Sequence, residues 1–401
     1  MKRNLWLVAT LALAFGCTRT TMPIREARSL AEARALAASE SRAILIDVST
    51  HGCAPCKAFD QASTSDNDLR EALAHVILIR SAPDGAPDLE PWRRNVSGYP
   101  TFILLDREGR EIDRWSGFGG ADNWRREFDN ALAQNIGLDQ YRARHEREPT
   151  VASALRLARI ADDSGDPILQ LKYLDQALTL PGEKPVELRR EQLRTLIAAG
   201  FVNRKELPNY DQRLIEVGLG ARDACRADAD CLLTLARIVT DRQLWSSTQA
   251  TVIESLLTAL PPQLSPEQER RRVSLRARTV WMLQHDQAAA LALWQQHLES
   301  QPRPSLDSAL EFAAWAFEER IGFAPVEAAC LAALEAATEP QKQAALLDAI
   351  GEARFNLGRV SEAIDAMDRA ATLEPTNPRH AEARDAWRVL SEKRPTTPAV
   401  L

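Results

Sequence analysis

The chain has 401 residues, of which 45% are hydrophobic and 26% are charged, and its formal net charge is −6 at pH 7. This length and composition are ample for two or three packed domains. The mildly acidic balance and the absence of a long basic run argue against a phosphate-binding surface, so we expect no nucleic-acid partner.

The first seventeen residues have the pattern of a secretory signal. Lys2 and Arg3 precede an apolar run over residues 5–15 that is too short to span a bilayer as a helix. The run ends in Ala14-Phe15-Gly16-Cys17, which resembles a bacterial lipobox and makes Cys17 the lipidated mature N-terminus. We therefore expect a membrane tether facing the periplasm, a compartment that permits disulfides. By family analogy, Thr18 favours the outer membrane.

Residues 44–49 form a strand-like run that leads into Cys53-Ala54-Pro55-Cys56, where a helix-like stretch opens. A helix N-terminus favours an anion, so Cys53 should be the more acidic and the attacking thiol. Cys56 lies three residues on, on the same helix face, and can resolve a mixed disulfide formed at Cys53. Pro55 is tolerated because it falls in the first turn. The pair itself would carry the electrons, and we expect no cofactor.

A zinc site is the alternative reading of the two cysteines. It needs a second pair of Cys or His ligands at comparable spacing, which the sequence does not contain. The redox interpretation is therefore favoured, and we expect no metal.

Asp47 lies in the apolar strand, six positions before Cys53. If buried there, its carboxyl would have a raised pKa. It could then exchange a proton with Cys56, through water, as thiol and disulfide interconvert. The alternative is an exposed aspartate at the end of a strand.

Pro100, in Gly98-Tyr99-Pro100-Thr101, immediately precedes the apolar strand 102–105. A cis peptide bond at this proline would remove the conflict with strand pairing. It would also turn the backbone of Tyr99 toward the cysteines, where its N–H and C=O groups could bind an extended substrate segment. A trans proline that only terminates the segment is the alternative, and base rates favour it.

Together, these motifs and the hairpin over residues 105–110 resemble the thioredoxin family, and the resemblance covers about residues 24–137. It implies an α/β domain with a central mixed sheet flanked by helices. It also implies that Cys53 is the nucleophile, Cys56 the resolving thiol, Asp47 the buried acid and Pro100 the cis proline beside the active site.

The segments 57–60 and 65–67 are closer to periplasmic thiol-reductase domains of this superfamily than to cytosolic thioredoxin. Gly52 stands where the family usually has a tryptophan, which removes an aromatic shield beside the nucleophile. We expect Tyr99, Gly52 and Pro55 to form the substrate-binding surface.

Residues 140–395 have apolar side chains at three- and four-residue spacing, with short Pro or Gly breaks, which predicts an all-helical solenoid similar to tetratricopeptide repeats. The clearest repeat is 344–377, where Gly351, Ala363 and Pro375 match the small residues and closing proline. A weaker copy spans 151–182. We expect helix pairs 249–260 with 266–285, and 288–300 with 306–320. Such arrays bind a peptide or protein, and a mere spacer is the alternative.

Cys225 and Cys231 are six residues apart. In one continuous helix their side chains would point about 120° apart and could not bridge. A break between two helices, with Asp228 or Asp230 as an N-cap, would allow a structural disulfide. Two separate buried thiols are the equal alternative.

The leading hypothesis is a membrane-tethered thiol-disulfide oxidoreductase, with reduction as the favoured direction. Its clients are cysteine-containing proteins, its electron donor is unknown, and its helical domain binds the client or another protein. The rival is an interaction scaffold whose thioredoxin-like domain is catalytically unimportant.

Overall fold

The computed structural model describes residues 23–81, 87–134, 136–182, 186–226, 228–240 and 246–392. By its internal contacts the chain divides into two compact units, Met1–Gly182 and Glu183–Leu401. Cys17 lies outside the described residues, so its lipidation stays a prediction. The expected fold class is confirmed, since a mixed sheet with flanking helices is followed by a long run of helices.

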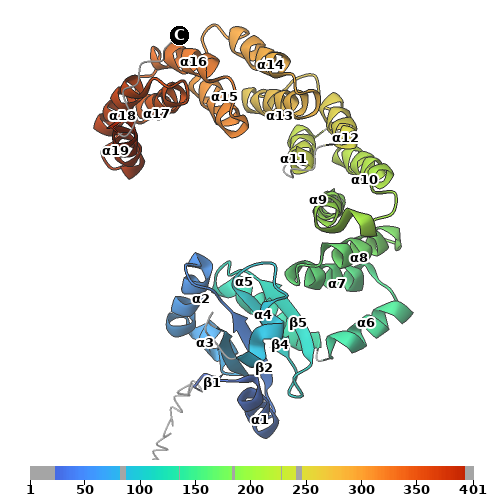
Figure 1. Cartoon of the computed structure of the whole chain (residues 1–401). Coiled ribbons are helices and arrows are strands. Elements are labelled where there is room, and N and C mark those ends of the chain that lie inside the picture. The colour runs from blue at the N-terminus through green and yellow to red at the C-terminus, as the bar shows by residue number, and fades with distance from the viewer. Residues whose placement is uncertain are drawn as a thin grey trace, which may run out of the picture. The chain divides into compact units, whose positions relative to one another are not determined.

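The first unit contains a five-stranded mixed sheet in the order β1-β3-β2-β4-β5 (Figure 1). The strands are β1 (Arg25–Ala27), β2 (Ala43–Val48), β3 (Val76–Ser81), β4 (Thr101–Leu105) and β5 (Glu111–Ser116). β3 runs parallel to both β1 and β2, whereas β4 is antiparallel to β2 and to β5. The two expected strands correspond to β2 and β4.

Helices cover both faces of this sheet. The unit contains α1 (Leu30–Glu40), α2 (Ala54–Ser65), α3 (Asn67–Leu73), the short 3-10 helix η1 (Pro87–Leu89), α4 (Glu90–Arg93), α5 (Ala121–Gln134), α6 (Leu138–Arg147), α7 (Val151–Asp163) and α8 (Pro167–Thr179). Leu45 belongs to the core shared with α2, α3 and α5, whereas Ile44 and Ile46 belong to the core shared with α1. Because strand side chains alternate, Asp47 faces the α2 side.

The first unit contains three helices that follow the predicted redox domain in the chain. We placed the redox domain at 24–137 and the helical domain at 140–395, and these bounds stay a prediction. In the structure α6, α7 and α8 belong to the same compact unit as the sheet. The physical reason lies in polar contacts, since Arg156 and Arg159 of α7 form ion pairs with Asp113 of β5. A hydrophobic pattern does not reveal such cross-element pairs.

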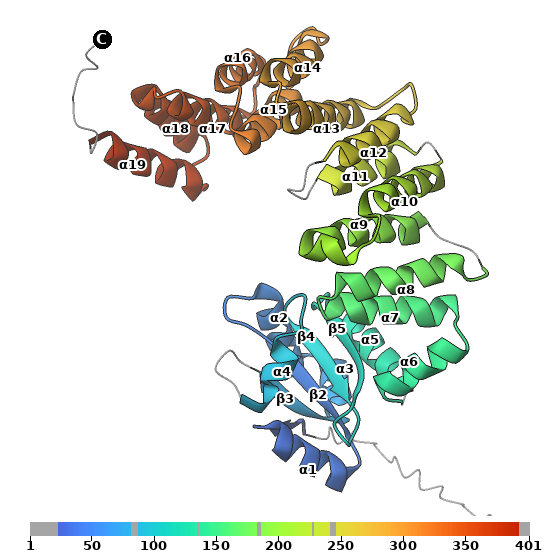
Figure 2. The same cartoon turned by 45° about the vertical axis from the view of Figure 1, so that its right-hand side comes forward.

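The second unit is all-helical in its described residues. It consists of α9 (Val186–Asn203), the 3-10 helix η2 (Arg204–Glu206), α10 (Tyr210–Cys225), α11 (Ala229–Thr240), α12 (Ser247–Thr258), α13 (Pro266–Gln284), α14 (Gln287–Glu299), α15 (Leu306–Glu319), α16 (Phe323–Leu334), α17 (Pro340–Asn356), α18 (Val360–Leu373) and α19 (Pro378–Glu392). Helices stack against their neighbours in chain order (Figure 2), as in a helical-repeat array.

The repeat predicted at 344–377 corresponds to α17 and α18, which pack closely. A Cβ on Gly351 would lie 3.2 Å from Met367 Cε and 3.3 Å from the carbonyl oxygen of Ala363. Both distances are shorter than ordinary van der Waals contacts, so α18 would have to yield slightly to a larger residue, which is consistent with a small residue at this crossing.

The helix pairing in the middle of the array differs from our expectation. We paired 249–260 with 266–285, but α13 packs mainly against α14, and α12 packs mainly against α10 and α11. Likewise, α15 pairs with α16 rather than with α14. Only residues 285–286 separate α13 from α14, whereas residues 259–265, with Pro261 and Pro262, separate α12 from α13. Short connections favour tight antiparallel pairs, so the proline-containing segments join successive pairs instead.

Cys225 and Cys231 form a disulfide, with 5.7 Å between their Cα atoms. Cys225 is the last residue of α10, and α11 begins at Ala229. Arg226 adopts a left-handed conformation at the break, and the Asp228 carboxylate accepts a 3.0 Å hydrogen bond from the Cys231 N–H. The helix break that we required is therefore present.

None of the helices that the structure describes has both the length and the apolar composition needed to cross a membrane.

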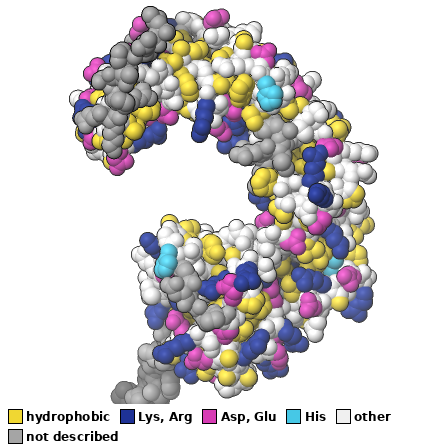
Figure 3. Space-filling view, in the orientation of Figure 1, with side chains coloured by type: hydrophobic (Ala, Val, Ile, Leu, Met, Phe, Trp, Pro, Cys, Tyr) yellow, Lys and Arg dark blue, Asp and Glu magenta, His cyan; other side chains and the backbone are white. Residues whose placement is uncertain are grey.

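On the surface shown in Figure 3, basic and acidic side chains are interspersed.

Candidate active site

Cys53 lies at the N-terminus of α2, where it is the N-cap residue. Its Sγ accepts a 3.1 Å hydrogen bond from the Cys56 N–H, and Pro55 lies in the first turn. The two cysteines are joined as a disulfide, with their Cα atoms 5.3 Å apart. The site is therefore in its oxidised form. The Cys56 N–H, which has no carbonyl partner in the first turn of α2, points at Cys53 Sγ.

The two sulfur-bearing residues differ in accessibility. Cys56 is only 4% exposed, whereas Cys53 is half-buried and is followed by the exposed residues Ala54 and Pro55. A disulfide of another protein can therefore approach Cys53 more readily than Cys56. Accessibility and helix position both distinguish Cys53 as the attacking residue.

Asp47 is buried, with 1% of its surface exposed. The Ser49 hydroxyl donates a 2.6 Å hydrogen bond to Asp47 Oδ1, and Arg80 Nη1 lies 3.7 Å from Oδ2. Burial raises the pKa of Asp47 to about 6, while the Ser49 hydrogen bond and the Arg80 charge lower it. Such a carboxyl can hold or release a proton near neutral pH.

Arg80 is a site residue that our sequence reasoning missed. It lies opposite Asp47 in the β2–β3 register and also forms ion pairs with Asp60 and Glu26. Its guanidinium donates a 3.1 Å hydrogen bond to the Ser63 hydroxyl. The available signal was a single cation near the end of an otherwise apolar strand.

The peptide bond between Tyr99 and Pro100 is cis. Pro100 is buried, its carbonyl accepts a 2.7 Å hydrogen bond from the Gly117 N–H, and Tyr99 is 43% exposed. Val48, the last residue of β2, pairs with Thr101, the first residue of β4. Because β2 and β4 are antiparallel, the segment that follows β2 and carries Cys53 lies at the same end of the strands as the segment that precedes β4 and carries Pro100.

Gly52, directly before the nucleophile, has a positive φ of +76°, and nothing lies within 4 Å of the position that a Cβ would take. An aromatic side chain would have space there but would require a strained backbone. The structure thus brings the cysteine pair together at the start of α2, with Asp47 at the end of β2 and Pro100 before β4.

Residues 30–132 match the family of the thioredoxin-like domain, and this part of the chain is a thioredoxin-like domain. A relative from Cronobacter sakazakii, the thiol:disulfide interchange protein DsbD, is 31% identical over 104 residues, which cover 25% of this chain and 18% of the relative. The DsbD of Escherichia coli K12 is 27% identical over 122 residues, covering 28% of this chain and 22% of the relative. The chain thus spans about a fifth of the length of these relatives.

A solved structure, the TPR2AB-domain:pHSP90-complex of yeast Sti1, aligns with 68% of this chain and 94% of its own. The aligned residues are 15% identical and the TM-score is 0.24. The helical character of the second unit follows from its own helices, α9 to α19.

Proposed function

We propose that this protein is a thiol-disulfide oxidoreductase that reduces disulfides in other proteins, with Cys53 as the nucleophile and Cys56 as the resolving thiol. The observation that carries the proposal is the position of the Cys53 sulfur, which caps α2, accepts the Cys56 N–H and is the more accessible of the pair. A helix N-terminus stabilises a thiolate, which is the nucleophilic form of cysteine.

The first step begins with both cysteines reduced. The Cys53 thiolate attacks one sulfur of the substrate disulfide, the substrate S–S bond breaks, and a mixed disulfide forms. The other substrate sulfur leaves as a thiolate and takes a proton from water. The electron pair of the broken bond stays with this leaving group.

The second step returns the site to the form seen in the structure. Cys56 loses its proton and attacks Cys53 Sγ, so the mixed disulfide breaks and the Cys53–Cys56 disulfide forms. The second substrate thiolate leaves and is protonated. The cysteine pair has given two electrons to the substrate and one proton, that of Cys56, to its surroundings. The substrate thiolates take their two protons from water. A dithiol reductant then restores the pair by the reverse exchange.

Asp47 is proposed to accept the proton of Cys56, through water. Its raised pKa, about 6, makes its carboxylate a stronger base than an exposed aspartate while leaving it mostly ionised at neutral pH. Tyr99 and Pro100, together with Gly52 and Pro55, are proposed to form the surface on which an extended substrate segment lies.

The remaining parts of the proposal rest on the sequence pattern and on the helical array. A lipid on Cys17 would hold the protein at a membrane, with the outer membrane favoured, and would place the redox domain in the periplasm. The helical repeats would bind the client or another protein partner.

Reduction of insulin by dithiothreitol tests this function. The wild-type chain should accelerate the reaction, Cys53→Ser should abolish the acceleration, and Cys56→Ser should accumulate mixed disulfides with insulin. Full acceleration of insulin reduction by both variants would refute the proposed function. A cellular role that survives Cys53→Ser would instead favour the scaffold.

A further inference from the structure

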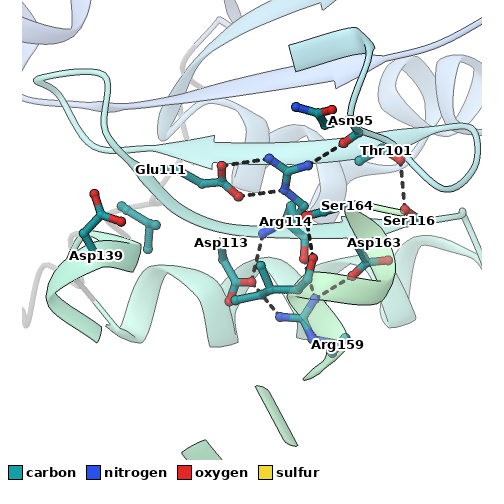
Figure 4. Close-up of polar contacts among 12 residues, drawn as sticks. Asn95, Thr101, Glu111, Asp113, Arg114, Ser116, Asp139, Arg159, Asp163 and Ser164 are labelled. Carbon is teal, nitrogen blue, oxygen red and sulfur yellow. Dashed lines mark hydrogen bonds and ion pairs between the residues drawn. The ribbon is translucent and has the colours of Figure 1, made fainter. Parts of the chain in front are cut away.

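The loop over residues 94–100, which carries Tyr99 and Pro100, is held by a buried polar network that reaches α7 (Figure 4). The network starts on β5, the edge strand of the sheet, where Asp113 and Arg114 are 3% and 6% exposed. Their hydrogen-bond and ion-pair partners among the described residues do not include the cysteines, and the proposed mechanism does not use them.

Arg114 connects the network to the start of the loop. Its guanidinium is bound in a bidentate manner by Glu111, at 2.7 and 2.8 Å, and its Nη1 donates a 2.6 Å hydrogen bond to the carbonyl of Asn95. Figure 4 shows the Arg114 side chain lying between these two partners. A bidentate arginine has a fixed orientation, so the Asn95 carbonyl is fixed as well.

Arg159 of α7 joins the helix to β5. It donates to Asp113 Oδ1 at 2.6 Å, to Asp163 Oδ2 at 3.1 Å, and to the carbonyl of Arg114. Arg156, one helical turn earlier, donates to Asp113 and to the carbonyl of Ile112, both at 3.1 Å. Two arginines on one helix face therefore satisfy the outward carbonyls of an edge strand.

The end of α7 contacts the loop itself. The Ser97 N–H donates a 3.2 Å hydrogen bond to the carbonyl of Asp163, and Gly165, with a φ of +68°, brings the following turn against Val96. A Cβ on Gly165 would lie 3.9 Å from the Val96 carbonyl oxygen. The loop is thus held from α7 by its backbone as well as through Arg114.

A second path runs through hydroxyl groups to the residues on either side of the cis proline. The Thr101 hydroxyl donates to the Gly98 carbonyl at 2.7 Å and accepts from the Ser116 hydroxyl, 2.9 Å away. Ser116 in turn lies beside the Asp163 carboxyl. Asp163 is 8% exposed, so its contacts are shielded from water. The two paths together hold the loop from residue 95 to residue 101.

We propose that Arg159 and Asp163 of α7 are positioning residues, which hold the Tyr99–Pro100 loop in the place where it binds the backbone of a protein substrate. This inference rests on the proposed function and deepens it. It assigns to a helix outside the thioredoxin-like domain a role in how tightly protein disulfides bind. Because a small disulfide needs only the sulfur of Cys53, the role concerns protein substrates alone.

The test compares two substrates on the full chain, insulin and hydroxyethyl disulfide, with initial rates measured over a range of concentrations. Arg159→Met should raise the KM for insulin on the order of tenfold, as expected for a misplaced binding group. The rate with hydroxyethyl disulfide should stay within about twofold of wild type, because the cysteines and Asp47 are untouched.

Arg125→Met is the matched control. Arg125 also pairs with an aspartate four residues on, Asp129, and donates to a backbone carbonyl, that of Asp68. It lies on α5, and these partners belong to neither α7 nor the loop. Both of its rates should equal those of wild type. Circular dichroism and thermal unfolding establish that each variant is folded at the assay temperature.

A folded Arg159→Met variant whose insulin KM is unchanged would overturn the inference. An equal loss of reduction rate with insulin and with hydroxyethyl disulfide would also overturn it, because it indicates general damage to the site. If Arg159→Met does not fold, Ser116→Ala decides, because it removes only one hydroxyl. An increased insulin KM in that variant supports the inference, and a wild-type KM refutes it. A wild-type chain that reduces hydroxyethyl disulfide but not insulin would instead refute the proposed protein substrate.

Discussion

Asp47 and Arg80 lie opposite each other on neighbouring parallel strands, with 3.7 Å between Asp47 Oδ2 and Arg80 Nη1. Arg80 also pairs with Asp60 and Glu26, so three carboxylates share one guanidinium. Burial therefore outweighs the nearby cation, and the pKa of Asp47 is raised rather than lowered.

Asp47→Asn should stabilise the oxidised protein at neutral pH. The folded-state pKa of Asp47 is about 6 and its ordinary value is 3.8, so its contribution to stability is fully present below pH 3.8 and is lost as the pH rises through 6. The asparagine at position 47 cannot ionise. The free energy of unfolding of the variant, relative to wild type, should therefore be higher at pH 8 than at pH 3 by up to roughly 3 kcal/mol. Urea unfolding at both pH values measures this difference.

The same variant should resolve mixed disulfides more slowly, because Cys56 loses its proton acceptor. If the free energy of unfolding changes between pH 3 and pH 8 by the same amount in Asp47→Asn as in wild type, the Asp47 carboxyl is solvated, contrary to its 1% exposure.

Arg80→Met should raise the pKa of Asp47 further. The charge of Arg80 stabilises the Asp47 carboxylate, so its removal leaves burial opposed by the Ser49 hydrogen bond alone. Carbon-13 NMR of the Asp47 carboxyl measures its titration midpoint. Arg107→Met, at an exposed arginine paired with Glu108 in the β4–β5 hairpin, is the control and should leave the midpoint unchanged. A midpoint at or below that of wild type would contradict the assigned effect of Arg80.

The cysteine pair, Asp47 and Pro100 could be located from sequence because each is a residue of unusual type at a fixed place beside an apolar strand. Arg80 could not be located in this way, because a cation at the end of a strand is expected to be exposed. Its pairing with Asp47 also depends on the register of two strands that are far apart in the chain.

The same limit explains why the contact of α7 with the sheet and the helix pairs could not be predicted. Arg156 and Arg159 are ordinary residues on an amphipathic helix until β5 supplies Asp113. The pairing in the array depends on which connections are short enough to form a hairpin, and helix periodicity alone does not reveal this for α12 and α13. Local chemistry was predictable, whereas contacts between distant elements were not.

Gly52→Ala should destabilise the protein by about 1–2 kcal/mol, because an L-residue at a positive φ is strained. Gly98→Ala is the control, since its Cβ also meets nothing within 4 Å and its φ lies outside the left-handed region. Urea unfolding of the two variants compares them. Equal stabilities would show that the backbone at Gly52 relaxes without cost.

Replacing both Cys225 and Cys231 by alanine should lower the free energy of unfolding of the second unit by roughly 2 kcal/mol, because a short covalent loop is lost from the unfolded state. Insulin reduction should be unchanged, since the Cys53–Cys56 pair lies in the first unit. Urea unfolding with and without the double substitution tests the first statement. A loss of insulin reduction without unfolding would give this second disulfide a redox role.

The pH dependence of alkylation at Cys53 tests the central claim most directly. In the reduced Cys56→Ser variant, mass spectrometry of the peptide that contains Cys53 gives the rate of its reaction with iodoacetamide separately from the other cysteines of the chain. The helix N-terminus predicts a half-maximal rate at or below about pH 7, against about 8.5 for an ordinary cysteine. A midpoint at or above the ordinary value, or a thiol that iodoacetamide does not reach, would contradict the assignment of Cys53 as the nucleophile.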